Sequence, residues 1–205
     1  MRFFDFLFPL RSDERLVRDS KTDTFLANMM PSLVPDTRPS TVALFPFHIP
    51  VVRAAIHEAK YHGNARAFTL LGEALVEYVR GTDTLESREV CLIPVPLGKS
   101  RRQERGFNQV EETLRNALRV LDPKIFTIDA SILIRVKETP TQVSLPRLQR
   151  EQNMQGAFMS TRPADPARMY YLVDDVITTG ETLQSAINAL KDAGAKYIIP
   201  LALAH

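Results

Sequence analysis

The sequence predicts an α/β protein whose largely parallel sheet is flanked by helices, and three observations support this prediction. Short, continuous apolar runs such as residues 90–95 (VCLIPV) are typical of strands buried on both faces. Stretches with apolar residues at helical spacing separate these runs, as expected for βαβ units. The chain has 205 residues, 44% of them apolar and 24% charged, which suits one well-filled globular core.

The first half of the chain predicts a loose segment followed by two helices. Residues 11–40 are polar and punctuated by prolines, which indicates a loosely structured connection. A helix is expected from Pro50, a residue suited to a first turn, and Gly63 would end it. A second helix begins near Arg66 and ends at Gly81.

The second half predicts strands that alternate with helices. The strands are residues 90–95, 131–136, 169–173 and 198–203, and the helices are residues 108–120 and a segment from Leu183 that Gly194 ends. Residues 137–153 are polar, broken by proline and too long for a tight turn, which favours a mobile loop. Its residues Gln142, Arg147 and Arg150 either close over a ligand or belong to a solvated loop.

Charge, cysteine content and hydropathy exclude several classes of protein. The net charge is only +2, so any attraction for nucleic acid must come from local patches. The one cysteine, Cys91, excludes an internal disulfide and a cysteine-based zinc site, and its apolar surroundings indicate a buried side chain. The spacings of His48, His57 and His62 do not favour a metal site. No apolar run approaches the ~18–20 residues that span a bilayer, so we expect a cytoplasmic protein without a membrane span.

The segment at residues 170–182 (YYLVDDVITTGET) carries the clearest chemistry. An apolar strand leads into Asp174 and Asp175, and ligands in parallel sheets bind beyond the carboxyl ends of strands. The turn that follows opens a helix, where backbone N–H groups and the helix dipole favour a phosphate. Two adjacent carboxylates suit vicinal hydroxyls. Together these groups predict a site for a ribose 5-phosphate, although a helix cap and a polar turn would also explain the pattern.

This segment resembles the signature of type I phosphoribosyltransferases over thirteen consecutive positions. The resemblance implies that fold, with a mostly parallel sheet flanked by helices. It also implies that Asp174 and Asp175 bind the ribose hydroxyls and act as catalytic residues. The ribose 5-phosphate site would comprise the acid pair and the turn, namely Asp174, Asp175, Val176, Ile177, Thr178, Thr179, Gly180, Glu181 and Thr182.

A basic stretch, expected to form a loop, follows the first predicted strand of the sheet. Residues 94–105 (PVPLGKSRRQER) contain four cations and one acid, and backbone donors near Gly98 suit a multiply charged anion. By resemblance to the same enzymes it would bind pyrophosphate through Leu97, Gly98, Lys99, Arg101, Arg102 and Arg105. Asn108 and Gln109 either cap the next helix or shape this basic stretch.

Several further stretches resemble ComF-family proteins over roughly residues 42–205. They are KYHG at residues 60–63, PVPL at 94–97, RGFNQ at 105–109, a TQ…L…R..N pattern from Thr141 and GAF at 156–158. ComF proteins commonly begin with a four-cysteine zinc module, and no cysteine precedes Cys91 here. We therefore expect a partly irregular N-terminal segment over residues 1–45 without bound zinc, and a phosphoribosyltransferase-like domain over residues 46–205.

Three functions agree with these features. One is a ComF-like role in DNA uptake during natural competence, in which the basic stretch meets single-stranded DNA or DNA-uptake proteins. Another is an active phosphoribosyltransferase with an unknown acceptor, and a third is a ligand sensor without catalysis. Each uses phosphoribosyl pyrophosphate or a related ligand with Mg²⁺, held by Asp174 and Asp175 directly or through water. An oligomer is compatible with the sequence.

Overall fold

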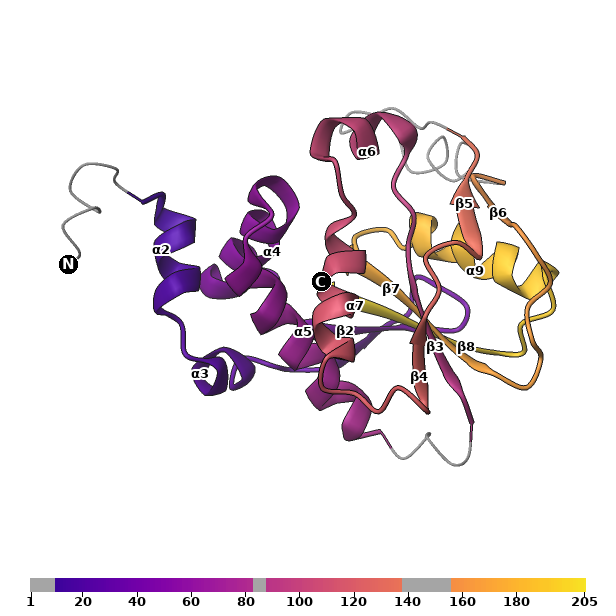
Figure 1. Cartoon of the computed structure of the whole chain (residues 1–205), viewed down its shortest axis with the longest axis horizontal. Helices are drawn as coiled ribbons and strands as arrows, with labels where there is room; N and C mark the ends of the chain where they lie inside the picture. The colour runs from indigo at the N-terminus through magenta and orange to yellow at the C-terminus, as the bar shows by residue number, and fades with distance from the viewer. Residues whose placement is uncertain (1–9, 83–87, 138–155) are drawn as a thin grey trace.

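A six-stranded sheet organises the chain in a computed structural model that describes residues 10–82, 88–137 and 156–205 (Figure 1). The strand order is β1-β2-β8-β7-β3-β4, and every pairing is parallel except that of β1 with β2. The predicted α/β class and mostly parallel sheet are therefore confirmed. The strands of the sheet are β1 (Ser32–Val34), β2 (Thr41–Phe45), β3 (Val90–Pro94), β4 (Phe126–Ile128), β7 (Met169–Val176) and β8 (Tyr197–Ala204).

Helices cover both faces of this sheet, as Figure 1 shows. One face carries α4 (Pro50–His62), α5 (Ala65–Arg80) and α7 (Gln109–Leu118), and α2 (Ser12–Asp19) and α3 (Thr22–Leu26) pack on α4 and α5. The other face carries α9 (Glu181–Asp192) and a two-stranded antiparallel sheet of β5 (Leu133–Arg135) and β6 (Phe158–Ser160). The predicted helix ends are confirmed at Gly63, which has a φ of 58°, and at Gly81.

Strands β3 and β7 are buried on both faces because their side chains alternate between two apolar cores. Leu92 and Tyr171 belong to the core beneath α4, α5 and α7, whereas Ile93 and Leu172 belong to the core beneath α9. This alternation explains why the sequence shows continuous apolar runs at these strands. Cys91 lies in the second core, as predicted, and burial raises the pKa of its thiol to about 11.

The prediction of a loose connection over residues 11–40 is wrong. That stretch forms α2, α3 and β1, and the side chains of Val17 and Phe25 are fully buried. The ring of Phe25 lies 5.0 Å from that of Phe45, so these elements pack on the main core. Strand β2 ends at the predicted boundary between residues 45 and 46, and it pairs in parallel with β8 as part of the main sheet.

The predicted strand at residues 131–136 exists as β5, but it pairs with β6 outside the main sheet. The edge strand β4, which pairs with β3, was not predicted because its three residues are too few to show a period. The basic stretch after β3 was predicted as a loop, yet its residues form the short helix α6 (Lys99–Arg105).

Candidate ligand-binding site at the carboxyl ends of β3 and β7

The candidate site lies where the order of strands reverses along the sheet. From β3 the chain passes to β4 on one side and then returns to β7 on the other side of β3. Pro94 of β3 stands opposite Val173 of β7, and the Val95 N–H donates to the Val173 carbonyl at 2.8 Å. The basic stretch and the acid pair therefore leave adjacent strands at the same edge, which is where open α/β sheets bind ligands.

The two acids point to opposite sides of the sheet because they are neighbours on one strand. Asp174 lines a small pocket, about 30 Å³ in volume, together with Val176, the turn and Leu183. Asp175 instead faces the helices of the other layer, where its Oδ2 accepts a hydrogen bond from Gln109 Nε2 at 2.8 Å and lies 3.3 Å from Lys60 Nζ. The structure thus gives the two carboxylates different surroundings.

The carboxyl group of Asp174 is also electrostatically unusual. Burial and the neighbouring charge of Asp175 raise its pKa to about 7. A nearby carboxylate and a poorly solvated position both disfavour the ionised form. The Asp174 carboxyl group therefore titrates near neutral pH.

The turn that follows β7 leads into α9 through a glycine with a left-handed backbone. Gly180 precedes α9 with a φ of 72°, a left-handed conformation that glycine adopts without strain. A Cβ atom at Gly180 would lie 2.9 Å from Thr37 Cγ2 and 3.1 Å from Asp36 Cβ. The loop between β1 and β2 therefore supports the turn from behind. Thr178 is exposed and Thr179 half-buried, so the outer side of the turn is accessible.

Glu181 belongs to the turn predicted to bind the phosphate, but its carboxylate does not suit a phosphate. Its Oε1 is buried and has no hydrogen-bond partner among the described residues. A carboxylate oxygen accepts hydrogen bonds, so it suits a hydroxyl or a cation better than a phosphate oxygen.

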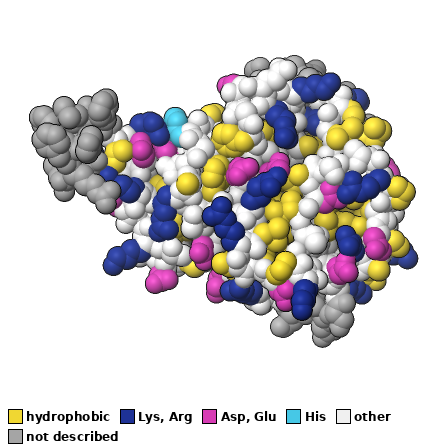
Figure 2. All heavy atoms as spheres, viewed as in Figure 1, with side chains coloured by type: hydrophobic (Ala, Val, Ile, Leu, Met, Phe, Trp, Pro, Cys, Tyr) yellow, Lys and Arg dark blue, Asp and Glu magenta, His cyan; other side chains and the backbone are white. Residues whose placement is uncertain are grey.

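The basic residues of α6 extend from the end of β3. Lys99 and Arg102 are exposed, whereas Arg101 and Arg105 are half-buried. Figure 2 shows Lys and Arg side chains at the top of the view, where Figure 1 places α6. Leu97 is half-buried and Gly98 caps the helix with an extended backbone. Exposed and half-buried cationic side chains thus follow the end of β3, the strand that pairs with β7.

Asn108 and Gln109 take different roles: Asn108 caps the next helix, and Gln109 contacts the basic stretch. Asn108 caps α7 by accepting from the Val110 N–H at 3.0 Å, and its Nδ2 donates to the Val95 carbonyl at 3.0 Å. Gln109 binds Asp175 with its Nε2 while its Oε1 accepts from Arg105 Nη1 at 3.2 Å. One amide side chain thus connects the basic helix to the acid pair.

Sequence reasoning missed Lys60 and the contact that Gln109 makes with Asp175. The signal available was the KYHG stretch, which was noted for its resemblance and given no chemical role. The ring of Tyr61 in that stretch lies 5.3 Å from Arg105 Cζ and 5.8 Å from Lys60 Nζ. The mobile-loop candidates Gln142, Arg147 and Arg150 lie outside the described residues.

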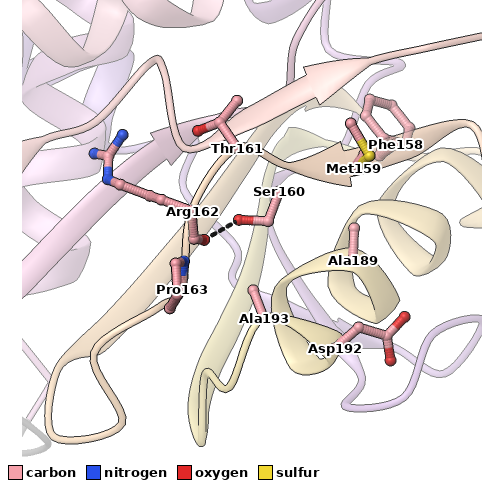
Figure 3. A pocket seen from close by; sticks show the side chains of 9 residues that line it. All are labelled: Phe158, Met159, Ser160, Thr161, Arg162, Pro163, Ala189, Asp192 and Ala193. Carbon is pink, nitrogen blue, oxygen red and sulfur yellow. Dashed lines mark hydrogen bonds between the residues drawn. The ribbon is translucent and has the colours of Figure 1, made fainter.

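Two other features of the described chain are less suited to a phosphorylated sugar. Figure 3 shows a pocket between the β6 segment and the end of α9, in which the Arg162 guanidinium points away from α9. This guanidinium forms an ion pair with Asp129. The ligating atoms of His57, Glu58 and His62 lie within 4.8 Å of one another. However, buried Glu58 already accepts two hydrogen bonds from Arg11, so a metal ion there would meet a guanidinium cation.

Comparisons with known proteins add one relative. No family model matches the chain. Over 111 residues the chain is 39% identical to Competence protein F of Haemophilus influenzae, a match that covers 53% of this chain and 47% of that protein. The match thus spans about half the length of this curated relative, and it supports the resemblance to ComF-family proteins. Among the described residues, no helix is both long and apolar enough to span a membrane.

Proposed function

We propose that this chain has a type I phosphoribosyltransferase-like fold and binds phosphoribosyl pyrophosphate at the carboxyl ends of β3 and β7. One observation carries the proposal: the phosphate-type turn and the basic helix α6 leave adjacent strands with an acid pair between them. The turn at the N-terminus of α9 takes the 5′-phosphate. Asp174, which lines the same pocket as the turn, accepts from the ribose hydroxyls. The cations of α6 take the pyrophosphate.

The donor set fits a Mg²⁺ ion that arrives with the ligand. Asp174 and Asp175 each offer one carboxylate, on opposite sides of β7. Asp174 already accepts the Asp175 N–H at 2.9 Å, and Asp175 accepts the Val176 N–H at 2.7 Å as well as the hydrogen bond from Gln109. Two partly engaged carboxylates cannot form a complete cage of oxygen ligands. Mg²⁺ usually keeps several waters and binds phosphates through only one or two carboxylates. When bound, the ion would neutralise charge on the pyrophosphate.

We further propose a role in natural competence, because the matched relative carries the name Competence protein F. In this role the exposed cations of α6 contact single-stranded DNA, and affinity falls steeply with salt. Reversing charge at Arg101 and Arg102 should weaken binding and reduce its salt dependence, whereas Arg53→Glu, at an exposed position of α4, should leave both unchanged. Equal affinities for the two variants and the wild type would refute the DNA contact.

Calorimetry with phosphoribosyl pyrophosphate tests the ligand proposal. The wild type should bind it in the presence of Mg²⁺, and the double variant Asp174→Asn/Asp175→Asn should lose most of that affinity. Asp192→Asn makes the same kind of change at the exposed end of α9 and should bind normally. The absence of binding to the wild type, with or without Mg²⁺, would refute the proposal. Pyrophosphate release with a panel of bases and amines then separates a transferase from a sensor.

A further inference from the structure

Lys60 approaches the acid pair from a separate layer of the molecule. It lies in the last turn of α4, which Gly63 ends, and its side chain is 26% exposed. A lysine at a helix C-terminus commonly interacts with the helix dipole and solvent. Here the Lys60 ammonium group lies 3.3 Å from Asp175 Oδ2, on a side chain that is only 12% exposed.

The other groups near Asp175 cannot replace this positive charge. Gln109 donates a hydrogen bond to the same Oδ2, but an amide is neutral. The guanidinium of Arg105 donates to Gln109 Oε1 instead, so it is one side chain away from the carboxylate. Within the described residues, Lys60 is the cation that forms an ion pair with Asp175.

A pair of adjacent carboxylates would otherwise repel a ligand that carries phosphate and pyrophosphate groups. A divalent cation removes that repulsion when it is bound. When no divalent cation is bound, an ammonium group can remove it instead. The same ammonium group also occupies Asp175 Oδ2, an atom that a divalent cation would use.

We propose that Lys60 is the resident counter-cation of Asp175. The Lys60 ammonium group supports ligand binding when divalent metal is absent, and it competes with that metal for the Asp175 carboxylate. The predicted effect of Lys60 on ligand binding rests on the proposed function, whereas its predicted effect on metal binding can be measured without an organic ligand. Lys60 is therefore assigned a charge-compensating and positioning role, and it sets how strongly the site depends on Mg²⁺.

The test compares Lys60→Met, which keeps the length of the side chain, with Lys60→Arg, which keeps the charge. Lys124→Met removes a charge from an exposed turn and is the matched control. Mn²⁺ alone, followed by electron paramagnetic resonance, is the metal probe. Phosphoribosyl pyrophosphate, followed by calorimetry with a chelator or with saturating Mg²⁺, is the ligand probe.

Lys60→Met should bind Mn²⁺ at least about tenfold more tightly than the wild type. Without divalent metal, its affinity for phosphoribosyl pyrophosphate should fall roughly 10- to 100-fold, the usual effect of losing one charged hydrogen bond, and Mg²⁺ should restore most of it. Lys60→Arg and Lys124→Met should resemble the wild type in both assays.

Unchanged Mn²⁺ affinity in Lys60→Met, or no Mn²⁺ binding to that variant, would overturn the inference. Equal losses of ligand affinity with and without Mg²⁺, accompanied by a lower melting temperature, would also overturn it and indicate a merely structural side chain. If the wild type binds no phosphoribosyl pyrophosphate at all, the proposed function fails, and the Mn²⁺ result still decides the role of Lys60.

Discussion

Replacing Gly180 with alanine tests whether the turn before α9 is held by the loop between β1 and β2. The substitution places a Cβ atom in a left-handed conformation, which costs about 1–2 kcal/mol. It also brings that atom to 2.9 Å from Thr37 Cγ2 and 3.1 Å from Asp36 Cβ, where the Thr37 side chain is fully buried. Overpacking of this kind costs a further ~1–3 kcal/mol, so we expect a total loss of about 2–5 kcal/mol.

Gly106→Ala is the matched control for the cost of placing alanine in a left-handed backbone conformation. Gly106 has a φ of 78°, and a Cβ atom there would meet nothing within 4 Å, so its replacement should cost only about 1–2 kcal/mol. Urea unfolding of both variants, with unchanged slopes, measures the two costs. The double variant Thr37→Ser/Gly180→Ala removes the methyl group that the new Cβ atom would contact. Its loss of unfolding free energy should therefore be smaller than the sum of the losses in the two single variants. Equal stabilities of Gly180→Ala and Gly106→Ala would refute the packing argument.

Three further predictions concern buried polar groups. Asn108→Ala should lower the free energy of unfolding by roughly 2–3 kcal/mol in urea titrations, because α7 loses its cap and the Val95 carbonyl loses a donor; Asn108→Asp should keep the cap and lose less. The pKa of Asp174 is raised to about 7 in the folded protein, above its unfolded value near 4. Its contribution to the stability of the ligand-free protein is therefore complete below pH ~4 and is lost as the pH rises towards 7. Asp174→Asn should flatten the plot of unfolding free energy against pH over this range. Burial alone would raise the pKa of Glu58, but hydrogen bonds from Arg11 and Asn64 outweigh burial and lower that pKa. The stabilisation that Glu58 provides should therefore be lost as the pH falls below about 4.5. Identical plots of unfolding free energy against pH for the wild type and Glu58→Gln between pH 5 and 3 would contradict this.

The central strands of the sheet were predictable because burial on both faces gives a continuous apolar run in the sequence. Strands β3 and β7 lie between two apolar cores, so nearly every residue is apolar and the run ends where the site begins. The acid pair and the turn were predictable for the same reason, since they follow a strand whose end could be located. The acids proved to belong to the last residues of β7 itself, and the alternation along that strand separates their side chains.

The contacts between segments distant in sequence were not predictable. Asp175 is 66 residues from Gln109, and no local period indicates that pairing. The N-terminal elements were missed because α2 is mostly polar and is fixed by Val17 and by the contact between Arg11 and Glu58. Helix α6 was missed because none of its residues is buried, so it shows no apolar face to indicate its period.

The most direct measurement of the central claim is an amide NMR titration of the protein with ribose 5-phosphate. The claim predicts that the largest shifts occur in the N–H groups of residues 178–182, with smaller ones at Asp174 and Asp175, because the phosphate binds at the start of α9. Dominant shifts around the pocket of Phe158 and Arg162, or no shifts at millimolar ligand, would contradict it.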